Sequence, residues 1–406
     1  MKTILVYDDE DKQTEQFGKK LNNALEKAGQ DKEFLVKQLD DEDFQDSIKQ
    51  LQDRQNKLRE NKKYSDDKTE FDNASIFIID YDLLYSQAGK LLTGEIVTYI
   101  VRCFSSCKLI IGLNQYGRNP FDLTLKGHPE SFADLNLGAD QLSNPDLWRG
   151  DWGHLRRGYR PWSWPNLSDF LHNFDKKVND VKEHLDTPIH KVIGFDLELL
   201  QLLPHAIVQF IGKDEKKEPD QVTFRDFVTK SENALRPKDA DALNDGINDH
   251  ILARIGAARI SKWLERLIIP EQNILVDAPH LISRYPSLMR GDRKQIETWN
   301  RTANLVDYSK LGLKTNLIEP YRFEKDYWIS RPVWFWNKLR ECEAIKEIKE
   351  PWGTDTPNWV FCEDASRFYE RKYCKEFLAD TVSPFTRRFT KGFEKVDYRP
   401  KFRFAL

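Results

Sequence analysis

The first third of the chain alternates short apolar runs with longer stretches in which apolar residues recur at helical spacing. The apolar runs are residues 3–7, 34–36, 76–79 and 108–113. The stretches with helical spacing are residues 12–28, 41–61 and 94–104. Short apolar runs of this kind are typical of strands that are buried on both faces. Because strands and helices alternate, we predict an α/β fold with a doubly wound parallel sheet covered by helices on both faces.

The pattern changes in the rest of the chain. Helical spacing recurs in residues 167–185, 195–211, 223–236, 251–267 and 364–380. Short strand-like runs, such as residues 273–276 and 359–361, lie between these stretches, and prolines divide the region into short elements. We therefore expect a mainly helical α+β organisation here.

The composition also changes between these two regions. Residues 148–166 mix four tryptophans with arginine, glycine and proline, which suggests an irregular connector that packs its aromatic rings. We therefore predict an α/β domain at residues 1–147, a Trp/Arg/Pro-rich connector at 148–166, and a mainly helical C-terminal domain with a basic tail at 167–406.

The bulk composition narrows the class of protein. Hydrophobic residues make up 39% of the chain, and 11 Trp and 24 Phe argue against extensive disorder. No apolar run approaches the roughly 20 residues that a membrane-spanning helix needs, and we identify no signal peptide. The five cysteines form no CxxC pair, which argues against a disulfide framework or a structural zinc site. We expect reduced thiols, a cytoplasmic protein and no membrane partner.

Three carboxylates follow two of the predicted strands. Asp8 and Asp9 come directly after the first apolar run, and Asp80 comes directly after the run at residues 76–79. The carboxyl ends of parallel strands meet at one edge of a sheet, where α/β proteins place their ligands. Carboxylate oxygens are the ligands that Mg²⁺ prefers, so Asp8, Asp9 and Asp80 are candidate metal ligands.

Four segments resemble, in order, the receiver domain of response regulators. They are residues 4–10 (Ile-Leu-Val-Tyr-Asp-Asp-Glu), 76–83 (Ile-Phe-Ile-Ile-Asp-Tyr-Asp-Leu), 92–95 (Leu-Thr-Gly-Glu) and 138–145 (Gly-Ala-Asp-Gln-Leu-Ser-Asn-Pro). The resemblance covers only the N-terminal part of the chain. It implies a flavodoxin-like fold, a Mg²⁺ site that includes the acidic pair, and Asp80 as the phosphoacceptor.

Two positions depart from the receiver pattern. The family places Ser or Thr after the fourth strand, where this chain has Asn114, and Lys before the proline that follows the fifth strand, where it has Asn144. Both departures remove groups that contact an aspartyl phosphate. We therefore expect a degenerate receiver, or pseudo-receiver, that binds a partner or dimerises without the usual phosphorylation switch.

An enzymatic interpretation of the same acids stays open. The sequence Asp80-Tyr81-Asp82 after an apolar strand resembles the DxD motif of haloacid-dehalogenase-type phosphatases and of some Mg²⁺ nucleases. Asp8, Asp9, Asp80 and Asp82 could then serve a Mg²⁺-dependent phosphohydrolase or nuclease. Asp277 and His280 form a further cluster, for which a strand-end turn with a structural histidine is the simplest interpretation.

The C-terminal tail is basic. From residue 365 to the end, eleven Lys and Arg face five Asp and Glu, a surplus of six positive charges. The candidate contacts with a partner are Arg387, Arg388, Lys391, Arg399, Lys401 and Arg403. Interleaved basic and aromatic residues suit nucleic acid. The tail could instead bind a protein partner. It could also form an ordinary pair of strands, which the alternation at residues 401–404 indicates.

These observations favour a regulatory or adaptor protein over an enzyme. The receiver-like domain would sense or dock, and the C-terminal domain would carry the output or the interaction. Degenerate receivers of this kind occur in bacterial signalling and phage-defence systems. The resemblance therefore leads us to expect such a setting for this protein. We expect a protein partner, and a homodimer is compatible with the sequence.

Overall fold

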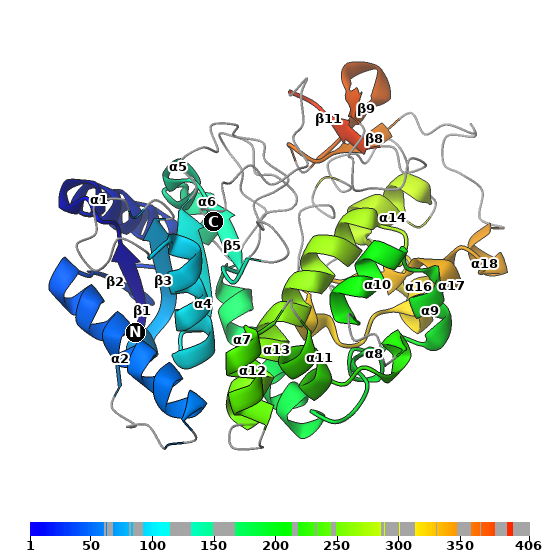
Figure 1. Cartoon of the computed structure of the whole chain (residues 1–406). Coiled ribbons are helices and arrows are strands. Elements are labelled where there is room, and N and C mark those ends of the chain that lie inside the picture. Colours follow the sequence, from blue (N-terminus) through cyan, green and yellow to red (C-terminus); the bar gives the residue numbers. More distant parts are fainter. Residues whose placement is uncertain are drawn as a thin grey trace.

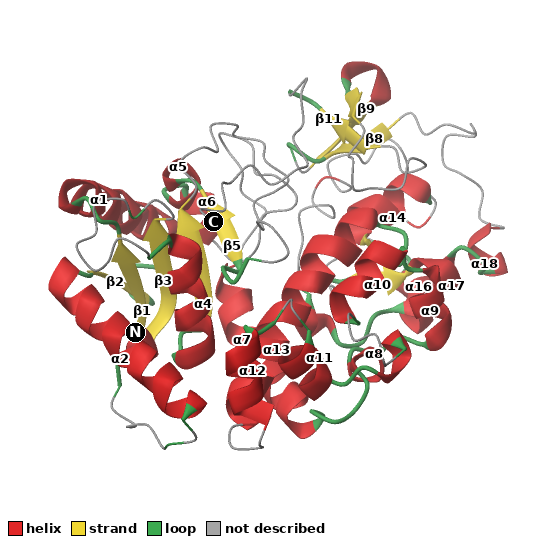
Figure 2. Cartoon of the chain, in the orientation of Figure 1, coloured by secondary structure: helices red, strands yellow, loops and turns green. Residues whose placement is uncertain are grey.

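Figure 1 shows the computed structural model of the chain. The residues described are 1–60, 62, 68–80, 83, 92–113, 131–148, 167–212, 218–231, 234–244, 249–285, 288, 300, 313–329, 331–346, 359–365, 367–377 and 388–392. Within these ranges the chain forms an N-terminal sheet with its helices, a group of C-terminal helices and two small C-terminal sheets (Figure 2).

A parallel five-stranded sheet forms the N-terminal part. Its strands are β1 (Lys2–Tyr7), β2 (Phe34–Gln38), β3 (Ala74–Asp80), β4 (Leu109–Leu113) and β5 (Leu135–Leu137). They lie in the order β2-β1-β3-β4-β5, and every neighbouring pair is parallel. This order is compatible with a flavodoxin-like fold. The predicted α/β organisation of this part is confirmed.

Helices cover both faces of this sheet. The helices of the N-terminal part are α1 (Asp11–Ala28), α2 (Asp41–Arg59), α3 (Glu70–Asn73), α4 (Gly94–Phe104), α5 (Ala139–Leu142) and α6 (Pro145–Trp148). Helices α1 and α6 enclose one apolar core with alternate residues of the strands, such as Ile4 and Ile78. Helices α2 and α4 enclose the other core, with Leu5 and Phe77. Because successive strand residues point to opposite faces, a strand of continuous apolar residues fills both cores.

The C-terminal part is mainly helical. Its α-helices are α7 (Leu167–Glu183), α8 (Ile189–Val192), α9 (Leu197–Leu202), α10 (His205–Ile211), α11 (Phe224–Lys230), α12 (Pro237–Asn244), α13 (Asp249–Trp263), α14 (Ala278–Arg284), α16 (Thr315–Ile318), α17 (Trp336–Leu339) and α18 (Glu343–Lys346). A π-helical turn, Leu264–Ile268, continues α13. Short 3₁₀ turns lie at Pro219–Gln221, Ile269–Glu271, Glu319–Tyr321, Asp326–Trp328 and Arg371–Tyr373.

Two small sheets complete the C-terminal part. Strands β6 (Leu275–Asp277) and β7 (Val333–Phe335) form an antiparallel pair. Strands β8 (Trp359–Cys362), β9 (Arg367–Glu370), β10 (Lys375–Phe377) and β11 (Arg388–Thr390) form a sheet in the order β10-β11-β8-β9. The helix predicted at residues 364–380 is therefore wrong, because residues 367–370 pair with β8 instead of winding into a helix.

Apolar packing joins the two parts, because one of the two cores contains residues of both. Helix α7 begins in the core on the α1 face of the N-terminal sheet, to which Leu167 and Leu171 belong. The same helix continues into the second core with Phe174 and Val178, where α13 packs against it. That second core also includes the face of the sheet covered by α2 and α4. The expected connector, residues 148–166, lies outside the described residues except for Trp148, which is buried in the α1 core.

Among the described residues, we find no helix whose length and apolar character would let it cross a lipid bilayer.

Candidate metal site

The order of the strands brings the three predicted acids together. Asp8 directly follows β1, and Asp80 is the last residue of β3. These strands are neighbours, with Tyr7 opposite Ile79, so the two carboxylates lie side by side at the carboxyl edge of the sheet. The chain leaves β1 toward β2 on one side, whereas β3 lies on the other side, so this edge is the topological switch point where such sheets bind ligands.

The three side chains form a compact oxygen cluster. Carboxylate oxygens of Asp8, Asp9 and Asp80 all lie within 4.8 Å of one another. Asp8 and Asp80 are buried, whereas Asp9 is half-buried. The Oδ1 atom of Asp8 accepts a hydrogen bond from the backbone N–H of Glu10 at 2.9 Å, and the hydroxyl of Thr14 donates to the Asp8 carbonyl oxygen at 3.1 Å. The first turn of α1 thus fixes the position of Asp8.

The electrostatics of the cluster suit a cation. Burial raises the pKa of Asp8, and the charges of Asp9 and Glu10 raise it further, against the opposing effect of the Glu10 N–H bond. A carboxylate whose charge is disfavoured in this way is stabilised by a positive ion among its neighbours. The donor set consists of hard oxygens, which fits a divalent cation such as Mg²⁺ or Ca²⁺ and does not distinguish between them.

Of the three other positions that the sequence marked near this edge, only Asn144 lies within the described residues. Asn114 and Asp82 lie outside them. Asn144 is half-buried between α5 and α6, and its carbonyl oxygen accepts from the N–H of Leu147 at 3.1 Å. Helix α5 therefore separates Asn144 from β5. Asn144 matches the receiver lysine in its position along the sequence, but it does not directly follow the fifth strand.

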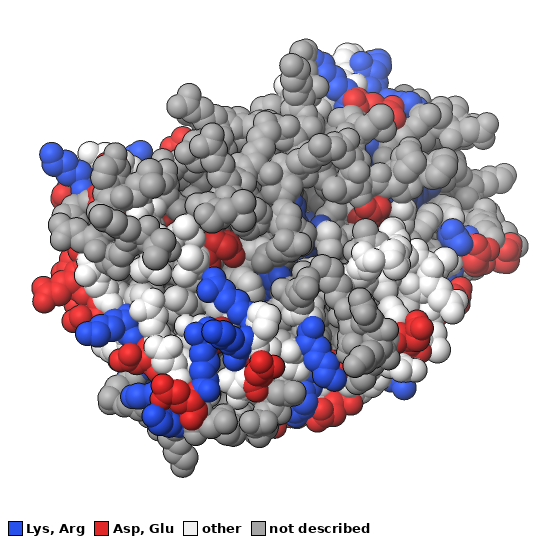
Figure 3. Space-filling view, viewed as in Figure 1, with Lys and Arg blue, Asp and Glu red and all other residues white. Residues whose placement is uncertain are grey.

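Only two of the six tail candidates lie within the described residues. Arg387, Arg399, Lys401 and Arg403 lie outside them. Lys391 is exposed, but Arg388 is buried and bonded to Glu363. The Arg388 side chain is therefore not available to a partner in this conformation. Figure 3 shows Lys and Arg side chains interspersed with Asp and Glu over the described surface of one face.

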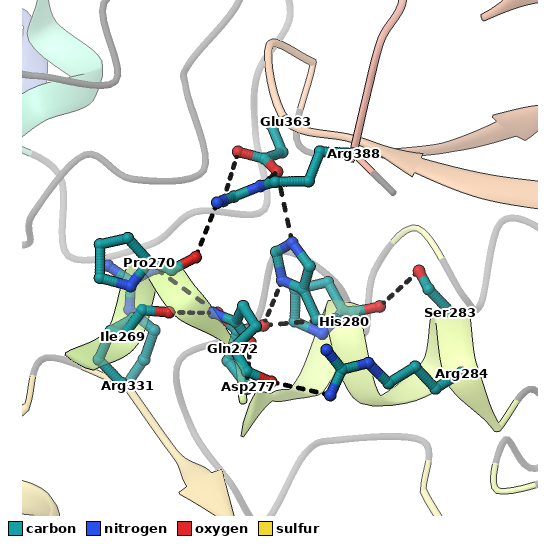
Figure 4. Close-up of polar contacts among 11 residues, drawn as sticks. Ile269, Pro270, Gln272, Asp277, His280, Ser283, Arg284, Arg331, Glu363 and Arg388 are labelled. Atoms are coloured by element: carbon teal, nitrogen blue, oxygen red, sulfur yellow. Dashed lines mark hydrogen bonds and ion pairs between the residues drawn. The ribbon is translucent and has the colours of Figure 1, made fainter. Parts of the chain in front are cut away.

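A buried polar network surrounds His280 (Figure 4). The Nδ1 atom of His280 lies 2.7 Å from Oδ1 of Asp277, which ends β6 and caps the N-terminus of α14. The Nε2 atom lies 3.4 Å from Oε1 of Glu363, which follows β8. The guanidinium of Arg388 in β11 contacts both oxygens of Glu363 and also donates to the carbonyl of Pro270. The network joins the four-stranded C-terminal sheet to α14.

The charges in this network stabilise one another. Although burial disfavours a charged imidazole, the charge of Asp277 and the hydrogen bonds to both acids raise the pKa of His280 above its usual value. Burial opposes ionisation of Asp277 and Glu363, but His280 and the neighbouring arginines hold the pKa of each carboxyl below its usual value. The sequence had indicated a structural histidine here, and the contacts agree with that interpretation.

The buried carboxylate of Asp239 joins the two parts of the chain. Asp239, in the first turn of α12, accepts hydrogen bonds from Tyr99 of α4 at 2.5 Å and from Gln55 of α2 at 2.9 Å. The Nε atom of Arg59 donates to its other oxygen at 2.6 Å. Nothing in the sequence around Asp239 marks this role, because all three donors lie more than 100 residues away along the chain.

Cations of α13 form another junction between the parts. Arg259 donates to the carbonyl oxygen of Ser131 at 2.6 Å, and Lys262 donates to the carbonyl oxygens of Ser131 and Ala133. Ser131 in turn donates through its hydroxyl to Glu95, in the first turn of α4, at 2.8 Å. The segment that leads into β5 is thus held between α4 and α13.

Comparisons of the chain with protein-family models, with curated proteins and with solved structures found no match.

Proposed function

We propose that the chain is a regulatory protein in which a receiver-like N-terminal domain binds Mg²⁺ and a protein partner, and in which the C-terminal domain carries the output. The observation that carries this proposal is the convergence of Asp8, Asp9 and Asp80 at the switch point of the sheet. The strand order and the place of Asp80 at the end of β3 support the resemblance to receiver domains. Signalling and phage defence are the settings in which we place it.

The contacts of α4 support a link between the cation site and the C-terminal domain. Helix α4 is the next described helix after Asp80 along the chain, and its first turn includes Glu95. Through Glu95 it contacts the segment held by α13, and through Tyr99 it contacts Asp239 of α12. A shift of α4 that follows cation binding therefore changes contacts made by two C-terminal helices. Two distant sites can be coupled when a packed element between them, here α4, has two arrangements and each site favours one of them.

Calorimetric titration with MgCl₂ tests the proposal directly. We expect the full-length protein to bind the ion, Asp80→Asn to lose binding, and Asp140→Asn to bind as the unchanged protein does. Asp140 is the matched control, because it is an exposed acid in the same part of the chain and is not part of the cluster. The proposal fails if the unchanged protein does not bind Mg²⁺, or if Asp80→Asn binds it equally well.

An enzymatic function is the second candidate, and the burial of Asp80 beside Asp8 favours it. A buried carboxylate next to a bound cation is suited to attack a phosphoryl donor or to hold an attacking water. Incubation with acetyl phosphate and Mg²⁺ followed by intact-mass measurement tests phosphoryl transfer to Asp80. Phosphatase and nuclease assays test hydrolysis, and activity that survives Asp80→Ala rules out this use of the cluster.

A further inference from the structure

Two cysteines of the small C-terminal sheet lie in contact. Cys362 is the last residue of β8, and Cys374 directly precedes β10. Both are reduced, and their Sγ atoms lie 3.3 Å apart. We propose that Cys374 and Cys362 form a redox-active dithiol, in which Cys374 reacts with a hydroperoxide and Cys362 then closes a disulfide with it. This site is separate from the acidic cluster and from the function proposed for it.

The burial of the two thiols assigns their order of reaction. Cys362 is fully buried and packs with Val360 and Phe389 in a small apolar cluster. Cys374 is half-buried at the margin of the same cluster. Because an oxidant arrives from the solvent, it reaches Cys374 first. The buried Cys362 is protected from the oxidant but is already in contact with the sulfur that the oxidant modifies.

The electrostatic surroundings favour the same order. The hydrogen bond from the Cys362 thiol lowers the pKa of Cys374, and the positive charge of Lys391 lowers it further. Lys391 is held nearby, since its ammonium group lies over the rings of Tyr369 and Tyr373. The hydrogen bond to Cys374, together with burial, raises the pKa of Cys362, so that Cys362 keeps its proton.

Burial and the charge of Asp364 act against ionisation of Cys374 and raise its pKa, and one hydrogen bond also favours the protonated thiol. Its Sγ atom lies 3.3 Å from the carbonyl oxygen of Glu370, to which the protonated thiol donates. Ionisation gives up this bond and retains the bond from Cys362. A hydrogen bond of a thiol to a neutral carbonyl is weaker than the contacts of a thiolate with a donor and a cation, so the balance still favours Cys374 as the nucleophile.

The reaction balances with a hydroperoxide as the oxidant. The Cys374 thiolate attacks one peroxide oxygen, the O–O bond breaks, and the sulfur becomes a sulfenic acid while the leaving oxygen takes up a proton as water or alcohol. The sulfur of Cys362 then attacks Sγ of Cys374. The S–S bond forms, the S–O bond breaks, and the hydroxyl leaves as water with the proton of Cys362. The two sulfurs lose two electrons, which reduce the peroxide.

The cross-link would join the end of β8 to the residue that directly precedes β10. The sheet order is β10-β11-β8-β9, so β8 and β10 both lie beside β11. Arg388 and Phe389 belong to β11, and Glu363 directly follows Cys362. Oxidation would therefore fix the sheet beside the ion pair of Glu363 with Arg388.

Thiol counting and peptide mapping of the full-length protein test the proposal. After treatment with an equimolar amount of hydrogen peroxide, we expect the free thiols of the denatured protein to fall from five to three. Digestion without reductant should yield a cross-linked peptide that contains Cys362 and Cys374. Cys362→Ser should instead accumulate a sulfenic acid at Cys374 that dimedone traps, and Cys374→Ser should keep all its thiols. Cys342→Ser, a half-buried cysteine elsewhere, is the control and should still lose two thiols.

Three outcomes overturn the proposal, and all come from the unchanged sequence, so they do not depend on the folding of a variant. The first is that all five thiols remain free. The second is a cross-link that joins other cysteines, such as Cys103 and Cys107, which are both buried. The third is stoichiometric binding of Zn²⁺ alone that protects Cys362 and Cys374 from peroxide, because the pair would then be metal ligands.

Discussion

The phenol hydroxyl of Tyr99 donates a hydrogen bond of 2.5 Å to the buried carboxylate of Asp239, and so connects the N-terminal helix α4 to the C-terminal helix α12. The same hydroxyl accepts from the backbone N–H of Arg236 at 3.2 Å, and the guanidinium of Arg236 lies 4.6 Å from the centre of the Tyr99 ring. A single side chain thus makes three contacts across the junction between the two parts.

Tyr99→Phe should destabilise the protein without changing its packing. The substitution removes only the hydroxyl and leaves a buried carboxylate with one donor fewer, which we expect to lower the free energy of unfolding by about 1.5–3 kcal/mol. Urea denaturation followed by circular dichroism measures this change. Tyr373→Phe is the matched control, because Tyr373 is 58% exposed, and it should leave stability unchanged. Equal effects of the two substitutions would contradict the importance of the Asp239 contact.

Asp8→Asn should stabilise the protein in the absence of divalent cations. The amide keeps an oxygen that can accept from the Glu10 N–H and removes one negative charge from the crowded cluster. We expect a gain of about 1 kcal/mol, which is the scale of one partly screened charge pair. Thermal unfolding in EDTA measures the gain, and added MgCl₂ should then stabilise the unchanged protein more than the variant. A loss of stability in EDTA would contradict the repulsion we infer.

His280→Gln should remove a contribution to stability that depends on pH. Because the pKa of His280 is raised in the folded protein, its contribution is fully present below the unfolded value of about 6.5 and is lost as the pH rises through the folded value. The difference in unfolding free energy between the unchanged protein and His280→Gln should be on the order of 3 kcal/mol near pH 6 and shrink at higher pH. Urea denaturation from pH 5.5 upward, about where His begins to titrate, measures it. His172→Gln, at an exposed position of α7, should show no such difference.

Lys262→Met should remove a contribution to stability that grows as the pH rises, whereas the contribution of His280 shrinks as the pH rises. Burial holds the pKa of Lys262 well below its usual value. The unfolded chain therefore binds more protons, and the contribution of Lys262 to stability increases as the pH rises from its folded value toward the unfolded value of about 10.4. We expect the unchanged protein to gain stability in this window relative to Lys262→Met. The same measurement on Lys49→Met, at an exposed position of α2, should give a constant difference.

The local patterns of the sequence were sufficient for most of the N-terminal elements. The apolar runs and helical spacings match β1 to β4 and helices α1, α2 and α4, because these signals depend on neighbouring residues. The acidic cluster could also be predicted, since adjacent parallel strands bring their carboxyl ends together. The predicted helix at residues 364–380 failed because pairing with β8 decides the conformation of β9, and a partner strand is not visible in local spacing.

The long-range polar contacts could not be predicted in the same way. His280 and Asp277 are three residues apart, and the sequence marked them as a cluster. Their third partner, Glu363, is 83 residues further along the chain, and its role follows only from the packing of the small sheet on α14. The contact between Cys362 and Cys374 was hidden for a similar reason, since no cysteine spacing identifies a pair that meets through the fold of a sheet.

The path of α7 has a consequence for how the protein unfolds. Its first turns fill the core under α1 with Leu167 and Leu171, and its later turns fill the core under α13 with Phe174 and Val178. Loss of this helix would expose both cores at once. The chain should therefore melt in one cooperative transition. A fragment that ends at residue 147 should be less stable than the same segment within the whole chain, because it lacks Leu167 and Leu171, which complete the core under α1.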